Sequence, residues 1–110
     1  MATIAKVALS SGAPTQITWT TTTGTDTLGT KTGLLIVNNT SGGTANLVID
    51  GASGGTDFVA GYGTVNTSAG FTFSVPAGQV RAMQLDDISK YLRGTVAVTG
   101  GGAGILAAII

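Results

Sequence analysis

The stretch 33-GLLIVNNTSGGTANLVIDG-51 decides the fold class of this chain. It contains two short apolar runs, Leu34–Val37 and Leu47–Ile49, which are joined by the polar segment 38–44. Short runs that are rich in Val and Ile and bounded by Asn, Gly and Asp are typical of β-strands, and a polar linker between them fits a β-hairpin. The stretch therefore predicts two paired strands with a polar tip.

The same kind of strand pattern recurs on both sides of this stretch. Residues 1–15 are expected to hold an extended arm or an edge strand, because 3–9 alternate between apolar and polar side chains. Residues 71–75 alternate as well, which predicts Phe71, Phe73 and Val75 on the inward face. Further strands are predicted at 16–20, 80–85, 95–99 and 105–110.

The remaining segments are predicted to connect these strands. Residues 21–32 are low in complexity and 51–70 are irregular, so both are expected to be loops. Residues 86–92 carry the helical signal of the chain: Asp86 or Asp87 would cap one turn. The apolar side chains of that turn would share one face, and they are Ile88, Tyr91 and Leu92.

Length and composition favour a single all-β domain. The chain has 110 residues, of which 43% are apolar and 9% are charged. An ordinary soluble domain has about 25% charged residues, and a disordered chain is more polar still. With about eight short strands at regular intervals, we expect a β-sandwich or a jelly-roll-like fold.

The charge balance excludes several classes of partner. Five basic and five acidic residues give a net charge of zero, and the basic residues do not cluster. Nucleic-acid binding and membrane-surface binding both depend on clustered Lys and Arg, so neither is expected. A neutral surface also repels other copies weakly, which favours a homo-oligomer, a dimer or a trimer. There is no cysteine, and the first residues lack a signal-peptide pattern, so we expect synthesis in the cytoplasm.

Few residues can carry catalysis. The chain has no His, Cys or Glu, and the adjacent pair Asp86 and Asp87 points in different directions, which makes a shared substrate improbable. Asp50 and Asp57 flank a Gly-rich segment that could offer oxygen ligands to calcium, although ordinary turn chemistry is the better interpretation. We therefore expect no enzyme activity and no cofactor.

Recognition by contact is the remaining possibility, and aromatic side chains are its best candidates. Trp19 is expected in the core more than at an interface, whereas Phe58 and Tyr62 lie in the long predicted loop and are better placed for contact. Asn39 at the polar tip and Tyr91 in the helical connector complete the candidate interface residues.

Four segments in order resemble small structural proteins of tailed bacteriophages, of the capsid decoration or cement type. They are 34-LLIVNNTSGGTANLVID-50, 71-FTFSVPAGQVRAMQL-85, 86-DDISKYL-92 and 94-GTVAVTGGGAGILAAII-110. The resemblance implies a β-sandwich or jelly-roll-like fold. It also implies oligomers on the exterior of a phage capsid that stabilise contacts between major capsid subunits, with no catalytic residue.

A second function stays open beside this one. A carbohydrate-binding or adhesion module of a phage tail or fibre would also be a neutral β-domain. It would place Trp19, Phe58 or Tyr62 on an exposed face, where sugar rings stack on aromatic side chains.

Overall fold

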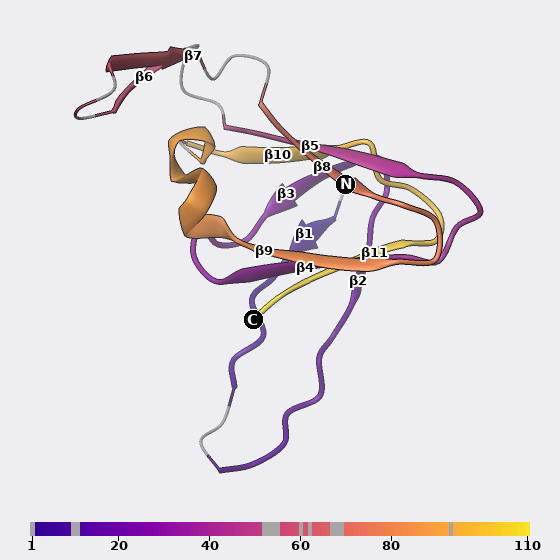
Figure 1. Cartoon of the computed structure of the whole chain (residues 1–110). Helices are drawn as coiled ribbons and strands as arrows, with labels where there is room; N and C mark the ends of the chain where they lie inside the picture. Colours follow the sequence, from indigo (N-terminus) through magenta and orange to yellow (C-terminus); the bar gives the residue numbers. More distant parts are fainter. Residues whose placement is uncertain are drawn as a thin grey trace.

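Two β-sheets packed face to face form the body of the protein, and a two-stranded ribbon lies beside them (Figure 1). This computed structural model describes residues 2–9, 12–51, 56–59, 61, 63–66, 70–92 and 94–110, with the backbone alone described for 56–59, 63–66 and 90. The all-β sandwich predicted from the sequence is confirmed.

Each sheet is named here by its strands. Sheet A has the order β1-β3-β10-β5-β8, with bounds Thr3–Ile4 (β1), Thr25–Leu28 (β3), Val96–Thr99 (β10), Ala45–Gly51 (β5) and Phe71–Val75 (β8). Sheet B has the order β2-β11-β4-β9, with bounds Thr20–Thr21 (β2), Ile105–Ile109 (β11), Leu34–Asn39 (β4) and Val80–Gln84 (β9). Strands β6 (Thr56–Val59) and β7 (Gly63–Asn66) form the separate ribbon. All described strand pairs are antiparallel except β1 with β3.

The hairpin predicted for 33–51 is wrong, although both of its strands exist. Strand β4 belongs to sheet B and β5 to sheet A, so residues 40–44 cross from one sheet to the other as an arch. Residues 76–79 form a second arch between β8 and β9. Each strand buries alternate side chains, and because the strands lie in different sheets, the apolar faces of β4 and β5 meet across the core.

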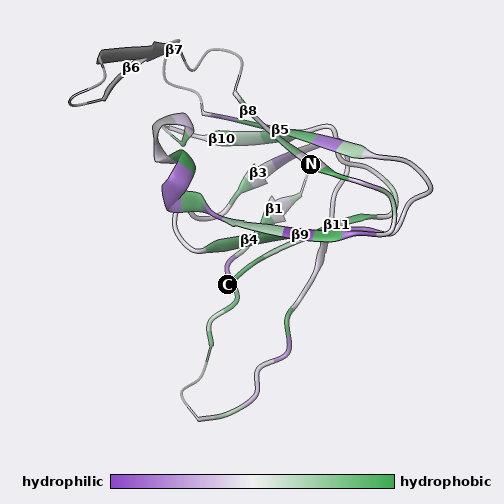
Figure 2. Ribbon diagram, viewed as in Figure 1, coloured by the Kyte–Doolittle hydropathy of each residue, from purple (hydrophilic) through white to green (hydrophobic). Residues whose placement is uncertain are grey.

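The core lies between the sheets, where the green apolar strands of Figure 2 face one another. Strand β11 is almost wholly buried and lies between β2 and β4, so it is an interior strand of sheet B. The described core residues are Ile4, Leu35, Val37, Ala45, Leu47, Ile49, Phe73, Val75, Leu85, Ile88, Leu92, Val96, Val98, Ile105, Ala107 and Ile109. As predicted, Phe73 and Val75 are buried, and Phe71 is half-buried against the core.

The predicted helical connector is a 3-10 helix, η1 (Leu85–Tyr91). Ile88 and Leu92 are buried on its inner face, as expected from their spacing. The predicted cap is wrong: the capping position is Gln84, no side chain caps the helix, and the two Asp residues lie exposed in its first turn. Helix η1 is therefore stabilised by the packing of its apolar side chains on the core and not by an acidic cap.

Two predicted loops contain strands. Residues 21–32 include β3, and 51–70 include the ribbon of β6 and β7, which raises the described strands to eleven. Conversely, the strand predicted at 16–20 is reduced to Thr20–Thr21, and the one at 3–9 ends at Ile4. Thr-rich sequence conceals such strands because Thr suits a pleated surface without marking an apolar face.

Candidate interaction surfaces

Asn39 is a structural residue and not a surface contact. Its side chain is fully buried, at 0% exposure. The amide nitrogen donates 2.8 Å hydrogen bonds to the carbonyl oxygens of Gly43 and Val75, and Oδ1 accepts hydrogen bonds from the backbone and the hydroxyl of Ser41. All polar atoms of this amide are thereby satisfied inside the fold. The structure argues against Asn39 as an interface residue.

Asp26 is a buried carboxylate that fastens the start of the chain to sheet A. Its oxygens accept hydrogen bonds from the backbone N–H of Ala2 at 3.0 Å and from the backbone and hydroxyl of Thr23 at 2.9 to 3.1 Å. Burial raises the pKa of the Asp26 carboxyl, but the hydrogen bonds from Thr23, Ala2 and Gly24 outweigh it and leave the pKa below its usual value. Asp26 therefore stays charged at neutral pH and acts as an anchor.

The Gly-rich segment 100–104 packs closely against Asn46, Thr22 and Ser41. The buried hydroxyl of Thr22 donates to the carbonyl of Ile105 at 2.8 Å and accepts from the N–H of Gly102 at 2.8 Å. A Cβ at Gly100 would overlap the carbonyl oxygen of Asn46, and φ there is +90°. These glycines are needed for close backbone approach.

Two segments extend away from the sandwich at opposite ends of Figure 1. One is the connection between β1 and β2, which is drawn at the bottom of the view, and the other is the β6–β7 ribbon at the top. The first carries Leu9, which is 63% exposed, and its returning part carries Ile17 and Trp19, which are both half-buried. These segments are the parts of the described chain best placed to reach a neighbouring molecule.

The structure separates the aromatic candidates. Trp19 is half-buried, which is neither a core position nor an open ring face. Tyr91 is also half-buried, and its ring lies 5.9 Å from that of Phe71 at an angle of 57°. The side chain of Phe58 and the whole of Tyr62 lie outside the described residues, so their contact roles stay predictions. No described contact brings these candidates together into one site.

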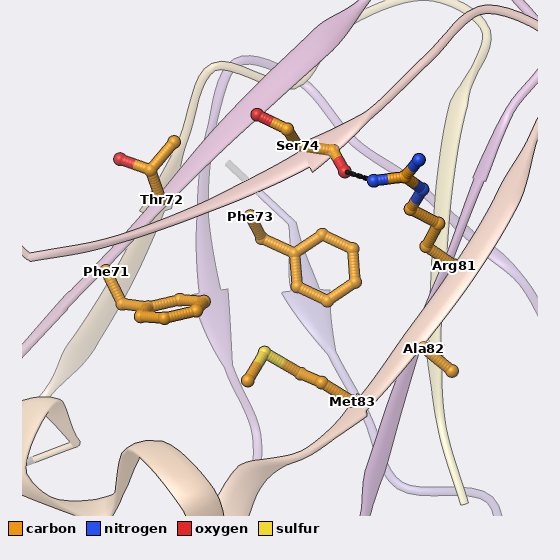
Figure 3. Close-up of a pocket in the computed structure, with 7 residues that line it drawn as sticks. All are labelled: Phe71, Thr72, Phe73, Ser74, Arg81, Ala82 and Met83. Atoms are coloured by element: carbon orange, nitrogen blue, oxygen red, sulfur yellow. Dashed lines mark hydrogen bonds between the residues drawn. The ribbon is translucent and has the colours of Figure 1, made fainter.

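An open groove lies at the side of the sandwich where strands β8 and β9 end their sheets. Its cavity has a volume of about 260 Å³ and is lined by Phe71, Thr72, Phe73, Ser74, Arg81, Ala82 and Met83. The Phe73 ring and the Met83 side chain point into it, whereas Thr72 and Ala82 point away (Figure 3). Arg81 lies at its rim, and its guanidinium donates to the backbone carbonyl of Ser74 at 3.5 Å. We call this feature the β8–β9 groove.

Sequence reasoning missed the groove, although its residues carry a signal. Arg81 and Met83 are paired with the buried Val37 and Leu35, so both occupy inward-facing positions of β9. A charged residue at an inward position of a strand is unusual and is typical of an exposed edge. The position of Arg81 on the inward face therefore indicates that β9 is the last strand of its sheet.

The two acidic residues considered for ion binding are only partly described. Asp50 is half-buried, and the side chain of Asp57 lies outside the described residues, so the expectation of ordinary turn chemistry instead of a calcium site is not tested there. Among the described residues, no three potential metal ligands cluster. Within the same part of the chain, no helix is long and apolar enough to cross a membrane.

Comparison with protein-family models, with curated proteins and with solved structures finds no match to this chain.

Proposed function

We propose that this chain is a structural virion protein, a capsid decoration or cement protein that binds the outer surface of a tailed-phage head. Its partner is the major capsid protein, and it stabilises contacts between capsid subunits. The observation that carries the proposal is the shape: a sandwich with extended segments at opposite ends (Figure 1). The Cα radius of gyration is 14.3 Å, against about 13 Å expected for a compact chain of this length.

This shape suits binding to a lattice of repeated subunits. A body that contacts one subunit while its extended segments contact others holds by several weak contacts, and each formed contact raises the effective concentration of the next. Affinity for the lattice then exceeds that of any single contact. The same reasoning supports a homo-oligomer, a dimer or a trimer, because copies that join multiply the contacts.

The chemistry of the surface supports the same proposal. With a net charge of zero, the chain has no electrostatic basis for holding nucleic acid or a lipid surface. The buried polar side chains Thr22, Asp26 and Asn39 are all used in holding the fold. The sequence resemblance to capsid decoration proteins agrees with an assembly role without catalysis, on the capsid exterior of a virion assembled in the host cytoplasm.

The test is to add the purified protein to heads that were assembled without it. We expect saturable binding, measured by co-sedimentation, and release of the packaged genome at a higher temperature than in undecorated heads. Electron cryo-microscopy should place the sandwich on the outer capsid surface. If the protein neither binds the heads nor raises their heat resistance, the proposal is wrong. Binding to a glycan array in place of heads would favour the carbohydrate-binding function instead.

A further inference from the structure

The two sides of the sandwich are closed in different ways. On one side, the first residues bridge both sheets: β1 pairs with β3 of sheet A, and Lys6 pairs with Ile109 of sheet B. The N–H of Val7 donates to the carbonyl of Ile109 at 2.7 Å, and Ile4 is fully buried between the sheets. One extended segment thus supplies both backbone pairing and an apolar side chain that fills the gap.

The opposite side has no such segment among the described residues. Strands β8 and β9 are the last strands of sheets A and B there, and the β8–β9 groove lies between them. Its floor is apolar, with Phe73, Met83 and the half-buried Phe71 (Figure 3). This groove is the counterpart of the gap that Ile4 fills on the closed side.

The backbone of β9 is available for pairing with a further strand. The N–H of Asn39 donates to the carbonyl of Gln79, and the N–H of Leu85 donates to that of Gly33. In an antiparallel pair, alternate residues direct their backbone groups to the partner. Gln79 and Leu85 direct their backbone groups toward β4, as do the residues two apart between them. The alternate residues therefore direct their backbone N–H and C=O groups away from β4, and they are Val80, Ala82 and Gln84. Val80 is also 56% exposed.

The rim of the groove carries one cationic group. Arg81 is the only charged residue among those that line the cavity. Its guanidinium makes long hydrogen bonds, 3.3 Å to Oε1 of Gln79 and 3.5 Å to the carbonyl of Ser74. A guanidinium is a planar fork of donors that matches a carboxylate in two parallel hydrogen bonds. The groove therefore favours a ligand that carries a carboxylate for Arg81 and, beside it, an apolar group for the floor.

We propose that the β8–β9 groove binds an extended segment of the capsid subunit that adds a strand to the edge of β9. This segment places a carboxylate on Arg81 and an apolar side chain between Phe73 and Met83. Because Arg81 and Met83 are two residues apart on one face, the carboxylate and the apolar side chain are also two residues apart. The proposal rests on the proposed function only for the source of the segment.

A synthetic peptide tests the recognition itself. The probe is acetyl-TLTDTLT-amide, which offers Asp with Leu two residues away on either side, and the control is acetyl-TLTNTLT-amide. In proton–nitrogen NMR spectra of the full chain, we expect the acidic peptide to shift the amide signals of Val80, Ala82 and Gln84. Loss of the carboxylate should weaken binding about tenfold, because it removes the charge-assisted hydrogen bonds to Arg81.

Two variants make the test specific. Arg81→Gln should weaken binding of the acidic peptide about tenfold, while Lys31→Gln removes the same charge at an exposed residue outside the groove and should leave binding unchanged. Both side chains are exposed, so both variants should fold, and their NMR spectra verify it. Equal binding of the two peptides, or shifts confined to other strands, would overturn the proposal.

Head binding separates this proposal from the proposed function. If the wild-type chain binds heads and Arg81→Gln binds them equally well, the groove proposal is wrong while the decoration function stands. If the wild-type chain binds the peptide but not the heads, the function and the named source are wrong while the groove chemistry stands. If Arg81→Gln abolishes self-association in sedimentation, the segment belongs to a second copy, and the capsid subunit is excluded as its source.

Discussion

The side-chain amide of Asn39 donates a 2.8 Å hydrogen bond to the carbonyl oxygen of Val75, and this bond joins the two sheets where both arches begin. The backbone of Asn39 also contacts the second arch: its N–H donates to Gln79 and its carbonyl accepts from Gly78. One buried residue therefore holds both crossings between the sheets.

Replacing Asn39 should destabilise the fold strongly. Asn39→Ala leaves the carbonyl oxygens of Gly43 and Val75 without these hydrogen bonds and removes the acceptor of Ser41. We expect a loss of about 3 kcal/mol in the free energy of unfolding, because buried polar groups left unpaired cost about 1–3 kcal/mol each. Urea unfolding followed by circular dichroism measures it. Asn38→Ala, one residue earlier and only half-buried, is the matched control and should cost less than about 1 kcal/mol.

Asp26 should make the stability depend on pH in the acid range. Because the pKa of its carboxyl is lowered in the folded protein, its contribution is present above the unfolded value, about 3.9, and is lost as the pH falls through the folded pKa. We expect Asp26→Asn to cost about 2 kcal/mol at pH 7, with hydrogen bonds to a charged group being worth about 1.5–3 kcal/mol. Below about pH 4 the difference in the free energy of unfolding between wild type and variant should become smaller.

The control for Asp26 is Asp87→Asn, which changes an exposed carboxylate. Its effect should stay within about 0.5 kcal/mol, as for other surface substitutions. Urea unfolding at a series of pH values gives both curves. If the difference in the free energy of unfolding between wild type and Asp26→Asn stays constant from pH 7 into the acid range, the charged form of Asp26 does not stabilise the fold.

Gly100 should tolerate no side chain. In Gly100→Ala the new Cβ overlaps the carbonyl oxygen of Asn46, and φ of +90° is unfavourable for any L-residue. We expect a loss of at least about 3 kcal/mol, or failure to fold. Gly42→Ala is the matched control, because no atom lies within 4 Å of a Cβ there. Thermal unfolding of the two variants should differ, and equal melting temperatures would show that the backbone at Gly100 shifts freely.

Leu9 should matter for binding and not for folding. Its side chain is 63% exposed on the segment between β1 and β2, so Leu9→Ser should change the stability by less than about 0.5 kcal/mol. If that segment contacts the capsid, the same change should weaken head binding about tenfold. Co-sedimentation at a range of protein concentrations measures this. Unchanged head binding would remove the segment from the proposed contact surface.

The apolar strands β4, β5, β8, β9, β10 and β11 could be predicted from the sequence because their signals are local, whereas β3, β6 and β7 were hidden in predicted loops. Alternation marks Phe73 and Val75 as inward residues, and an apolar run marks 105–110 as a strand. The partners of each strand could not be predicted. Residues 40–44 can close a hairpin or cross between sheets, and the choice depends on where distant strands such as β11 pair.

The burial of two polar residues could not be predicted from the sequence for a related reason. Asn39 in a polar run suggests an exposed tip, and Asp26 in a Thr-rich segment suggests a loop. Each is buried because hydrogen-bond donors or acceptors from distant residues satisfy it, namely Val75 and Ala2. Such partners cannot be identified from local composition. Arg81 differs from these two residues because it is exposed, and its spacing of two residues from Met83 on one strand places both side chains on the same face.

The strand order also determines when the protein can fold during its synthesis. Strand β10 lies between β3 and β5 in sheet A, and β11 lies between β2 and β4 in sheet B. Both come after all the other strands in chain order, so until they are synthesised each sheet consists of two parts with no strand to join them. Pairings between such distant segments form slowly. Neither layer can therefore be completed before residues 96–110 have emerged from the ribosome, and a truncation that removes 96–110 would divide both sheets at once.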